Sequence, residues 1–120
     1  MCCAVALKNL DIIEREGLVE RAAVMGERFL SSLKRLESLP LIGEVRGLGL
    51  VAGVELAGDK KGAPCPAGVS AKVQAYNEAH GLICRVRDDT IMLAPPLVIT
   101  EEQIDRIVNT LGESIANASK

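Results

Sequence analysis

The sequence contains very few aromatic residues: one phenylalanine, Phe29, one tyrosine, Tyr76, and no tryptophan. Hydrophobic residues nevertheless make up 48% of the 120 positions, so a core has to be built from Leu, Ile, Val and Ala. A chain of this length suits one domain that buries roughly two thirds of the surface its unfolded form exposes. An aliphatic core of this kind favours helices packed on a sheet.

Long apolar runs and an excess of positive charge are also missing. Fourteen basic and sixteen acidic residues give a net charge of −2 and a pI near 5.4. No basic stripe alternates with aromatic residues, which argues against nucleic acid and anionic membrane as partners. The apolar runs are only a few residues long, whereas a transmembrane helix needs about 20. We therefore expect a soluble, cytoplasmic protein with no nucleic-acid or membrane partner.

The chain is poor in residues for a metal centre or a catalytic nucleophile. Its cysteines, Cys2, Cys3, Cys65 and Cys84, show no C-x-x-C spacing, and His80 is the only histidine, so a zinc site has too few ligands. There is no G-x-S-x-G motif, which argues against a hydrolase. Four cysteines would permit a disulfide, but nothing points to an oxidising compartment, so free thiols are expected.

Two helices are predicted at the start of the chain. Residues 4–16 carry apolar side chains at helical spacing, and Gly17 follows where a left-handed residue would end the helix. Residues 19–36 repeat apolar positions every three or four residues, and Pro40 follows the pattern. The opposite face of this second helix carries charges of both signs, which is typical of a solvated surface rather than of a binding site.

Two more helices are predicted further along. One covers residues 67–80 and stops at Gly81, and its terminal His80 favours the helix dipole when protonated. The other begins with Thr100 and Gln103, which have the spacing of a capping box, and continues through apolar residues at helical intervals.

Residues 41–56, "LIGEVRGLGLVAGVEL", lack helical periodicity and predict a short strand, a glycine break and a longer strand. Gly47, Gly49 and Gly53 superficially resemble a dinucleotide-binding loop. That loop, however, joins a strand to a helix, whereas these glycines interrupt a strand. Glycines in such positions mark a bulge or a close approach of the backbone to a neighbour.

The stretch "GLICRVRDDTIMLAPPLVIT" predicts a hairpin with strands at 82–86 and 91–94 and a turn at 87–89. Pro95 and Pro96 end the pairing because proline has no N–H to donate. The two adjacent aspartates of the turn point in different directions, so they are interpreted as turn residues rather than as a catalytic carboxylate pair.

The predicted order of elements is ααββαββα. The fold class is therefore α/β of the α+β-like kind, with a small antiparallel sheet of about three to four strands packed with about four helices. The Gly- and Pro-rich loop at 57–68 is too short to divide domains, so residues 1–120 are predicted to form a single domain.

Three segments carry a family resemblance: "CCAVALKNLDIIEREGLVERAAVMGERFLSSL", "IGEVRGLGLVAGVEL" and "GLICRVRDDTIMLAPPLVITEEQIDRIV". Together they resemble the C-terminal part of the class III, or omega, aminotransferases, which are pyridoxal-phosphate enzymes of fold type I. The similarity covers nearly the whole chain, and the segments follow the family's order. It implies that residues 1–17 are the end of the interdomain helix and that the rest is the small C-terminal domain.

The resemblance also implies a function for the complete enzyme. Such an enzyme transfers an amino group between an amine or omega-amino acid and a 2-oxo acid, uses pyridoxal 5'-phosphate, and is expected to be a homodimer. In the family, the covalently bound lysine, the aspartate at the pyridinium nitrogen and most of the phosphate site lie in a large domain that precedes these segments. We therefore expect this chain to be an inactive fragment, with no catalytic residue, no cofactor-binding residue and no metal site. The alternative is an independent α/β interaction or regulatory module that catalyses nothing.

Arg85 is the one expected substrate-binding residue. Strand alternation alone favours a surface cation paired with Asp88 or Asp89, a kind of pair that contributes little energy. The resemblance implies another role, because Arg85 stands nine positions before Ala94 of "APP". There, many omega-aminotransferases carry a mobile arginine that binds the carboxylate of the 2-oxo acid and swings out for an apolar amine. Arg87 does not match that position. A guanidinium on a long flexible stem suits this task because it binds carboxylates in a bidentate way.

Overall fold

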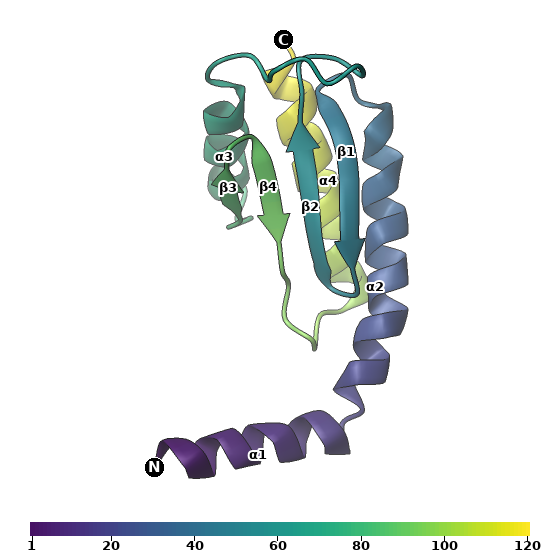
Figure 1. Ribbon diagram of the computed structural model, residues 1–120, viewed down its shortest axis with the longest axis vertical. Coiled ribbons are helices and arrows are strands. Elements are labelled where there is room, and N and C mark those ends of the chain that lie inside the picture. The colour runs from purple at the N-terminus through teal and green to yellow at the C-terminus, as the bar shows by residue number, and fades with distance from the viewer.

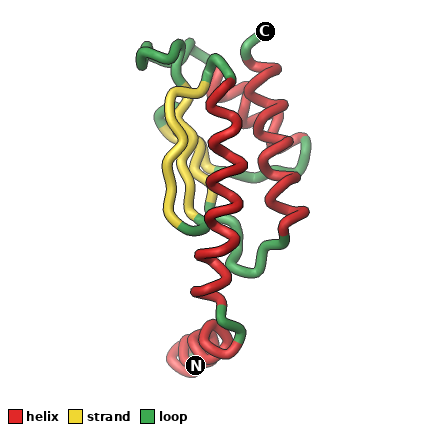
Figure 2. Tube along the Cα trace, turned by 90° about the vertical axis from the view of Figure 1, so that its right-hand side faces the viewer, coloured by secondary structure: helices red, strands yellow, loops and turns green.

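The computed structural model describes residues 1–120 and consists of a sheet layer and a helix layer, from which the first helix projects (Figures 1 and 2). In chain order the elements are α1 (Cys2–Arg15), α2 (Leu18–Lys34), the short 3-10 helix η1 (Arg35–Ser38), β1 (Ile42–Leu48), β2 (Val51–Leu56), α3 (Val69–Ala79), β3 (Arg85–Arg87), β4 (Thr90–Leu93) and α4 (Glu101–Ala118). The predicted order of helices and strands is confirmed. No helix is both long enough and apolar enough to cross a membrane.

The four strands form one antiparallel sheet in the order β1-β2-β4-β3. The glycine break falls at Gly49, which has a φ of 54° and lies in the two-residue connection between β1 and β2. The strands on either side are of nearly equal length, seven and six residues, rather than short and long as predicted. The positive φ of Gly49 and the close approach of α2, described below, account for Gly47 and Gly49.

The second hairpin joins β3 to β4 through Asp88 and Asp89. Both residues have positive φ angles, 47° and 63°, as a type I′ turn requires. The turn is confirmed in place but not in length, because Arg87 belongs to β3 and pairs with Thr90, and β3 spans Arg85–Arg87 rather than residues 82–86. The backbone N–H of Leu82 is not available for pairing with a neighbouring strand, because it donates to the carbonyl of Asn77 at 2.8 Å.

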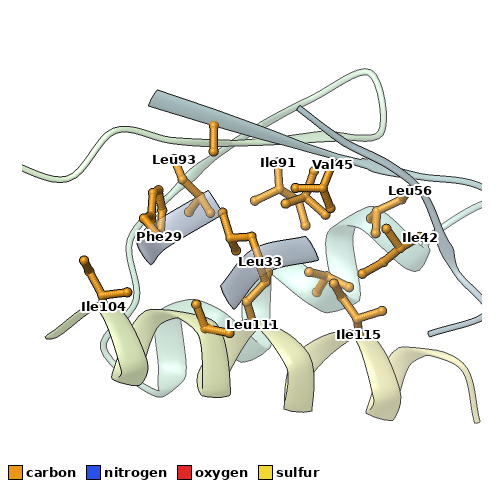
Figure 3. Packing of buried hydrophobic residues seen from close by; sticks show 14 of the residues in the cluster. Phe29, Leu33, Ile42, Val45, Leu56, Ile91, Leu93, Ile104, Leu111 and Ile115 are labelled. Atoms are coloured by element: carbon orange, nitrogen blue, oxygen red, sulfur yellow. The ribbon is translucent and has the colours of Figure 1, made fainter. Parts of the chain in front are cut away.

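Helices α2, α3 and α4 lie on the same side of the sheet (Figures 1 and 2). The core lies between these helices and the sheet, and Figure 3 shows side chains of the strands, of α2 and of α4 pointing toward one another. Its fully buried members are Phe29 and Leu33 of α2, Ile91 of β4, and Ile104 of α4, among others. No element covers the opposite face of the sheet, which we call the open face (Figure 2).

Helix α1 projects away from the rest of the molecule (Figure 1), and none of its residues is buried. Gly17 separates it from α2 with a left-handed φ of 58°, as the sequence predicted. The apolar residues that gave α1 its helical pattern are therefore exposed, including Leu7 at 68% and Leu10 at 55%.

Candidate functional site

The strand register places four residues in one row across the sheet: Arg46 on β1, Gly53 on β2, Met92 on β4 and Arg85 on β3. Residues directly opposite one another in an antiparallel sheet point to the same face. Their neighbours along the chain point toward the helices, as the complete burial of Ile91 shows. The row therefore lies on the open face.

The open face is charged at one end. Arg46 donates to the carboxylates of Glu44 and Glu55 at 2.6 and 2.9 Å. These hydrogen bonds, the one to Glu55 more than the one to Glu44, raise the pKa of Arg46. The guanidinium of Arg46 is thus already engaged and is a poor candidate for binding a substrate anion.

The open face also carries exposed apolar side chains. Leu48 is 87% exposed, Val51 60% and Met92 47%. Exposed apolar side chains scattered singly are common in soluble proteins, but these belong to adjacent strands of one surface. The open face thus combines apolar contact area with arginines at its two edges.

Arg85 is exposed on the edge strand β3, and its guanidinium has no hydrogen-bond or ion-pair partner in the structure. The two aspartates of the hairpin are engaged elsewhere. Arg87 pairs with Asp88 at 3.3 Å, and Asp89 accepts a hydrogen bond from the hydroxyl of Ser70. The ion pair that strand alternation predicted for Arg85 is therefore not formed. The guanidinium of Arg85 is available to bind an anion.

The backbone leading into Arg85 is held by the end of α3. Gly81 has a φ of 79° and turns the chain, the Leu82 N–H donates to the Asn77 carbonyl, and the Asn77 side-chain amide donates to the sulfur of Cys84 at 3.7 Å. Asn77 is completely buried, and its Oδ1 has no partner. Burial also raises the pKa of the Cys84 thiol. These contacts fix the segment that enters β3.

A hollow of about 380 Å³ opens where β4 ends, between the segment that follows α3 and helix α4. Ile83, Met92, Ala94 and Pro95 form part of its apolar lining, and Arg106 of α4 belongs to its wall. Met92 belongs both to this hollow and to the row that contains Arg85. The hollow and the open face are thus contiguous at Met92.

No lysine of the chain is suited to hold pyridoxal phosphate covalently. All six, Lys8, Lys34, Lys60, Lys61, Lys72 and Lys120, are exposed, whereas lysines that act as nucleophiles are activated by desolvation or by a neighbouring cation. Lys60 donates to the carbonyls of Leu39 and Ile42 at 2.8 and 2.7 Å and to that of Glu37. No aspartate is buried where it could face a pyridinium nitrogen. No lysine or aspartate of the chain thus has the burial that a covalent site for this cofactor requires.

The histidine and the cysteines, which the sequence offered as other candidates for a functional site, have structural roles or none. His80 ends α3, where its ring stacks on that of Tyr76 at a centroid distance of 3.9 Å. The four cysteines are free thiols, and no three His, Cys, Asp or Glu residues gather in a group able to hold a metal ion.

Sequence reasoning overlooked Met92 and Asn77. A signal for Met92 existed, because a two-residue turn at Asp88 and Asp89 pairs Arg87 with Thr90 and consequently Arg85 with Met92. No comparable signal existed for Asn77, since its burial depends on how α3 packs.

Residues 1–115 match the family described as aminotransferase class-III. The chain is 36% identical over 123 residues to gamma aminobutyrate transaminase 1, mitochondrial, of Solanum lycopersicum, covering 100% of the chain and 24% of that protein. It is 39% identical over 119 residues to isoleucine 2-epimerase of Lentilactobacillus buchneri, covering 95% and 26%.

Among solved structures, the omega transaminase from Pseudomonas jessenii in complex with PMP superimposes with a TM-score of 0.91 at 39% identity, covering 97% of the chain and 26% of that structure. The chain thus spans about a quarter of the length of the relatives it matches.

Proposed function

Because the chain belongs to the class III aminotransferase family, we propose that it is the C-terminal small domain of an enzyme that transfers an amino group between an amine or omega-amino acid and a 2-oxo acid. The family uses pyridoxal phosphate, which in the complete enzyme supplies the chemistry of amino transfer. The proposal places the cofactor's covalent lysine and its phosphate site outside these 120 residues. The chain alone is accordingly inactive.

One observation carries the proposed role of the chain: the guanidinium of Arg85 is exposed on the open face without a partner. A planar guanidinium binds a carboxylate through two parallel hydrogen bonds. Its long stem allows the charge to leave when a substrate without a carboxylate binds, since a desolvated charge without a partner is costly. Arg85 is therefore the substrate-carboxylate residue in this proposal.

The test is made in the complete enzyme with the variant Arg85→Ala. Loss of a charged hydrogen-bonding partner costs about 1.5 to 3 kcal/mol, which is roughly a 10- to 150-fold loss of kcat/KM. We expect this loss for 2-oxo acids and a much smaller one for amines that lack a carboxylate.

Arg87→Ala is the matched control, because Arg87 lies on the same short strand and already pairs with Asp88. It should leave both substrates nearly unaffected. Equal losses for acids and amines in Arg85→Ala, or no loss in either, would assign Arg85 to the protein surface instead. Inversion of an amino acid without consumption of a 2-oxo acid would point to an epimerase.

The proposal includes a homodimer, a cytoplasmic location and no nucleic-acid or membrane partner. The competing possibility is an independent interaction or regulatory module. The DNA upstream of the Met1 codon distinguishes the two, because the proposal requires a continuous reading frame that encodes a large domain with the cofactor lysine. A stop codon directly upstream in that frame would favour the module.

A further inference from the structure

We propose that Met92 is a specificity-determining residue of the same substrate site, where its side chain contacts the apolar part of an amine while the guanidinium of Arg85 is turned away. The inference rests on the proposed function of Arg85. It adds that the site is suited to amines whose remaining part is apolar, and it identifies Met92 as the residue that contacts this part.

The first argument is position. Met92 is the direct cross-strand partner of Arg85, and side chains paired in this way have Cβ atoms about 4.5 to 5.5 Å apart. Both side chains point to the open face, where Met92 remains 47% exposed. A ligand whose carboxylate meets Arg85 therefore has the Met92 thioether as its neighbour on the sheet.

The second argument is space. On its other side Met92 faces Gly53, which has no side chain, so the long methionine chain is not confined between two bulky neighbours. Met92 also lines the hollow of about 380 Å³, together with Ile83, which is 88% exposed. Apolar surface therefore continues from Met92 into a concavity of the size that small ligands occupy.

The third argument is chemical. A substrate without a carboxylate leaves Arg85 without a partner, so the charge has to move toward water and an apolar group has to take its place against the ligand. Methionine is unbranched and polarizable, adapts to irregular shapes and makes favourable contacts with aromatic rings. The apolar stem of Arg85 can also lie along Met92 while its charged end stays solvated. Met92 thus presents an apolar surface to the substrate both when Arg85 binds a carboxylate and when its guanidinium is turned toward water.

The experiment uses the complete enzyme and measures kcat/KM separately for benzylamine and for pyruvate. Met92→Gln keeps an unbranched side chain of similar length but brings a polar amide to the contact. We expect it to lower kcat/KM for benzylamine about 10- to 20-fold, at the low end of the range by which a small change in an apolar pocket alters specificity, and to change kcat/KM for pyruvate less than about twofold. Met92→Leu should stay within about threefold of the wild type for both, because an apolar replacement of similar volume preserves the contact.

Leu48→Gln is the matched control, since Leu48 lies on the same open face but on the opposite edge strand β1. It should change neither substrate. Equal losses for benzylamine and pyruvate in Met92→Gln, or an effect of Leu48→Gln of the same size, would overturn the inference. If Met92→Gln does not fold, Met92→Ala gives the same comparison, with the thermal unfolding midpoint as the check on folding.

Arg85→Ala measured in parallel separates the two proposals. If it lowers the turnover of pyruvate while Met92→Gln changes nothing, only the inference on Met92 fails. If neither substitution changes either substrate, the substrate site lies elsewhere and both proposals fail.

Discussion

Gly26 of α2 rests directly on Gly49 in the turn between β1 and β2: a Cβ atom added to Gly26 would lie 2.5 Å from the backbone carbon and oxygen atoms of Gly49. A Cβ atom added to Gly47 would lie 2.4 Å from the carbonyl oxygen of Val51 in the same hairpin and 2.6 Å from the side chain of Leu30 in α2. The glycines of "RGLGL" therefore allow a helix to approach the hairpin closely. This contact brings α2 onto the sheet that carries the open face.

We predict that Gly26→Ala destabilises the protein. In an isolated helix the change would be favourable by about 1 kcal/mol, but the new methyl group would collide with the backbone of Gly49, which cannot turn away. Overpacking of this kind costs about 1 to 3 kcal/mol, so the free energy of unfolding measured in urea should fall by about that amount.

Gly112→Ala is the control for that prediction. Its Cβ would lie 3.1 Å from the end of the Leu36 side chain, which can move. The free energy of unfolding should change by less than about 1 kcal/mol. A Gly26→Ala variant as stable as the wild type would mean that α2 does not approach the hairpin as closely as described.

A second prediction concerns the lysines. When the chain is incubated with pyridoxal phosphate and reduced with borohydride, the label should be spread over exposed lysines, with none dominant. The reason is that all six are exposed and that Lys60 is occupied by backbone carbonyls. Peptide mass spectrometry measures the distribution. In the complete enzyme, labelled in parallel, the dominant site should lie outside these 120 residues; a dominant site at one of the six would contradict the proposal.

The third prediction is self-association of the isolated chain. Leu7 and Leu10 lie on one side of α1, are 68% and 55% exposed, and no other part of the chain covers them. Exposed apolar patches of several hundred Å² usually bind a partner. Sedimentation velocity should show oligomers whose population rises with concentration.

The substitution Leu10→Lys should shift that equilibrium toward the monomer. Asn9→Lys introduces the same charge on a different side of the helix and should shift it much less. A compact monomer for the unmodified chain at high concentration would show that the apolar surface of α1 needs no partner.

Local sequence rules were sufficient for the elements whose ends depend on neighbouring residues. The capping box is present as predicted: the Gln103 N–H donates to Thr100 Oγ1 at 3.3 Å, and the Thr100 N–H donates to Gln103 Oε1 at 3.0 Å. The turn at Asp88 and Asp89 also depends only on short-range geometry. Such features follow from the backbone preferences of two to four residues, so the sequence alone identified them.

Features that depend on distant contacts were not predictable in this way. Leu82 lies outside β3, and its N–H donates to the carbonyl of Asn77, a hydrogen bond that forms only once α3 is in place. The periodicity of α1 correctly predicted a helix but carried no information on whether another element covers it. Similarly, the sequence placed Arg85 on a strand, whereas the engagement of both hairpin aspartates elsewhere required the structure.

The fourth prediction concerns alkaline pH. Burial raises the pKa of the Cys84 thiol and also that of Cys65, where the nearby charge of Asp89 adds to the effect. In the unfolded chain a thiol ionises with a pKa of about 8.5, so above this pH the unfolded state binds fewer protons than the folded state. The slope of stability with pH is then negative. The contribution of these thiols is therefore complete below about pH 8.5 and declines as the pH rises toward the higher folded-state pKa values.

Urea unfolding between about pH 7.5 and 9.5 tests this, a range that ends below the ordinary pKa of tyrosine, about 10. Cys84→Ala should flatten the decline above pH 8.5, because one of the two thiols responsible has been removed. Cys2→Ala is the matched control, since Cys2 is exposed on α1, and it should leave the slope unchanged. A slope that Cys84→Ala does not alter, or a stability that rises across this range, would show that the thiol beside Asn77 is not shielded from water as the structure places it.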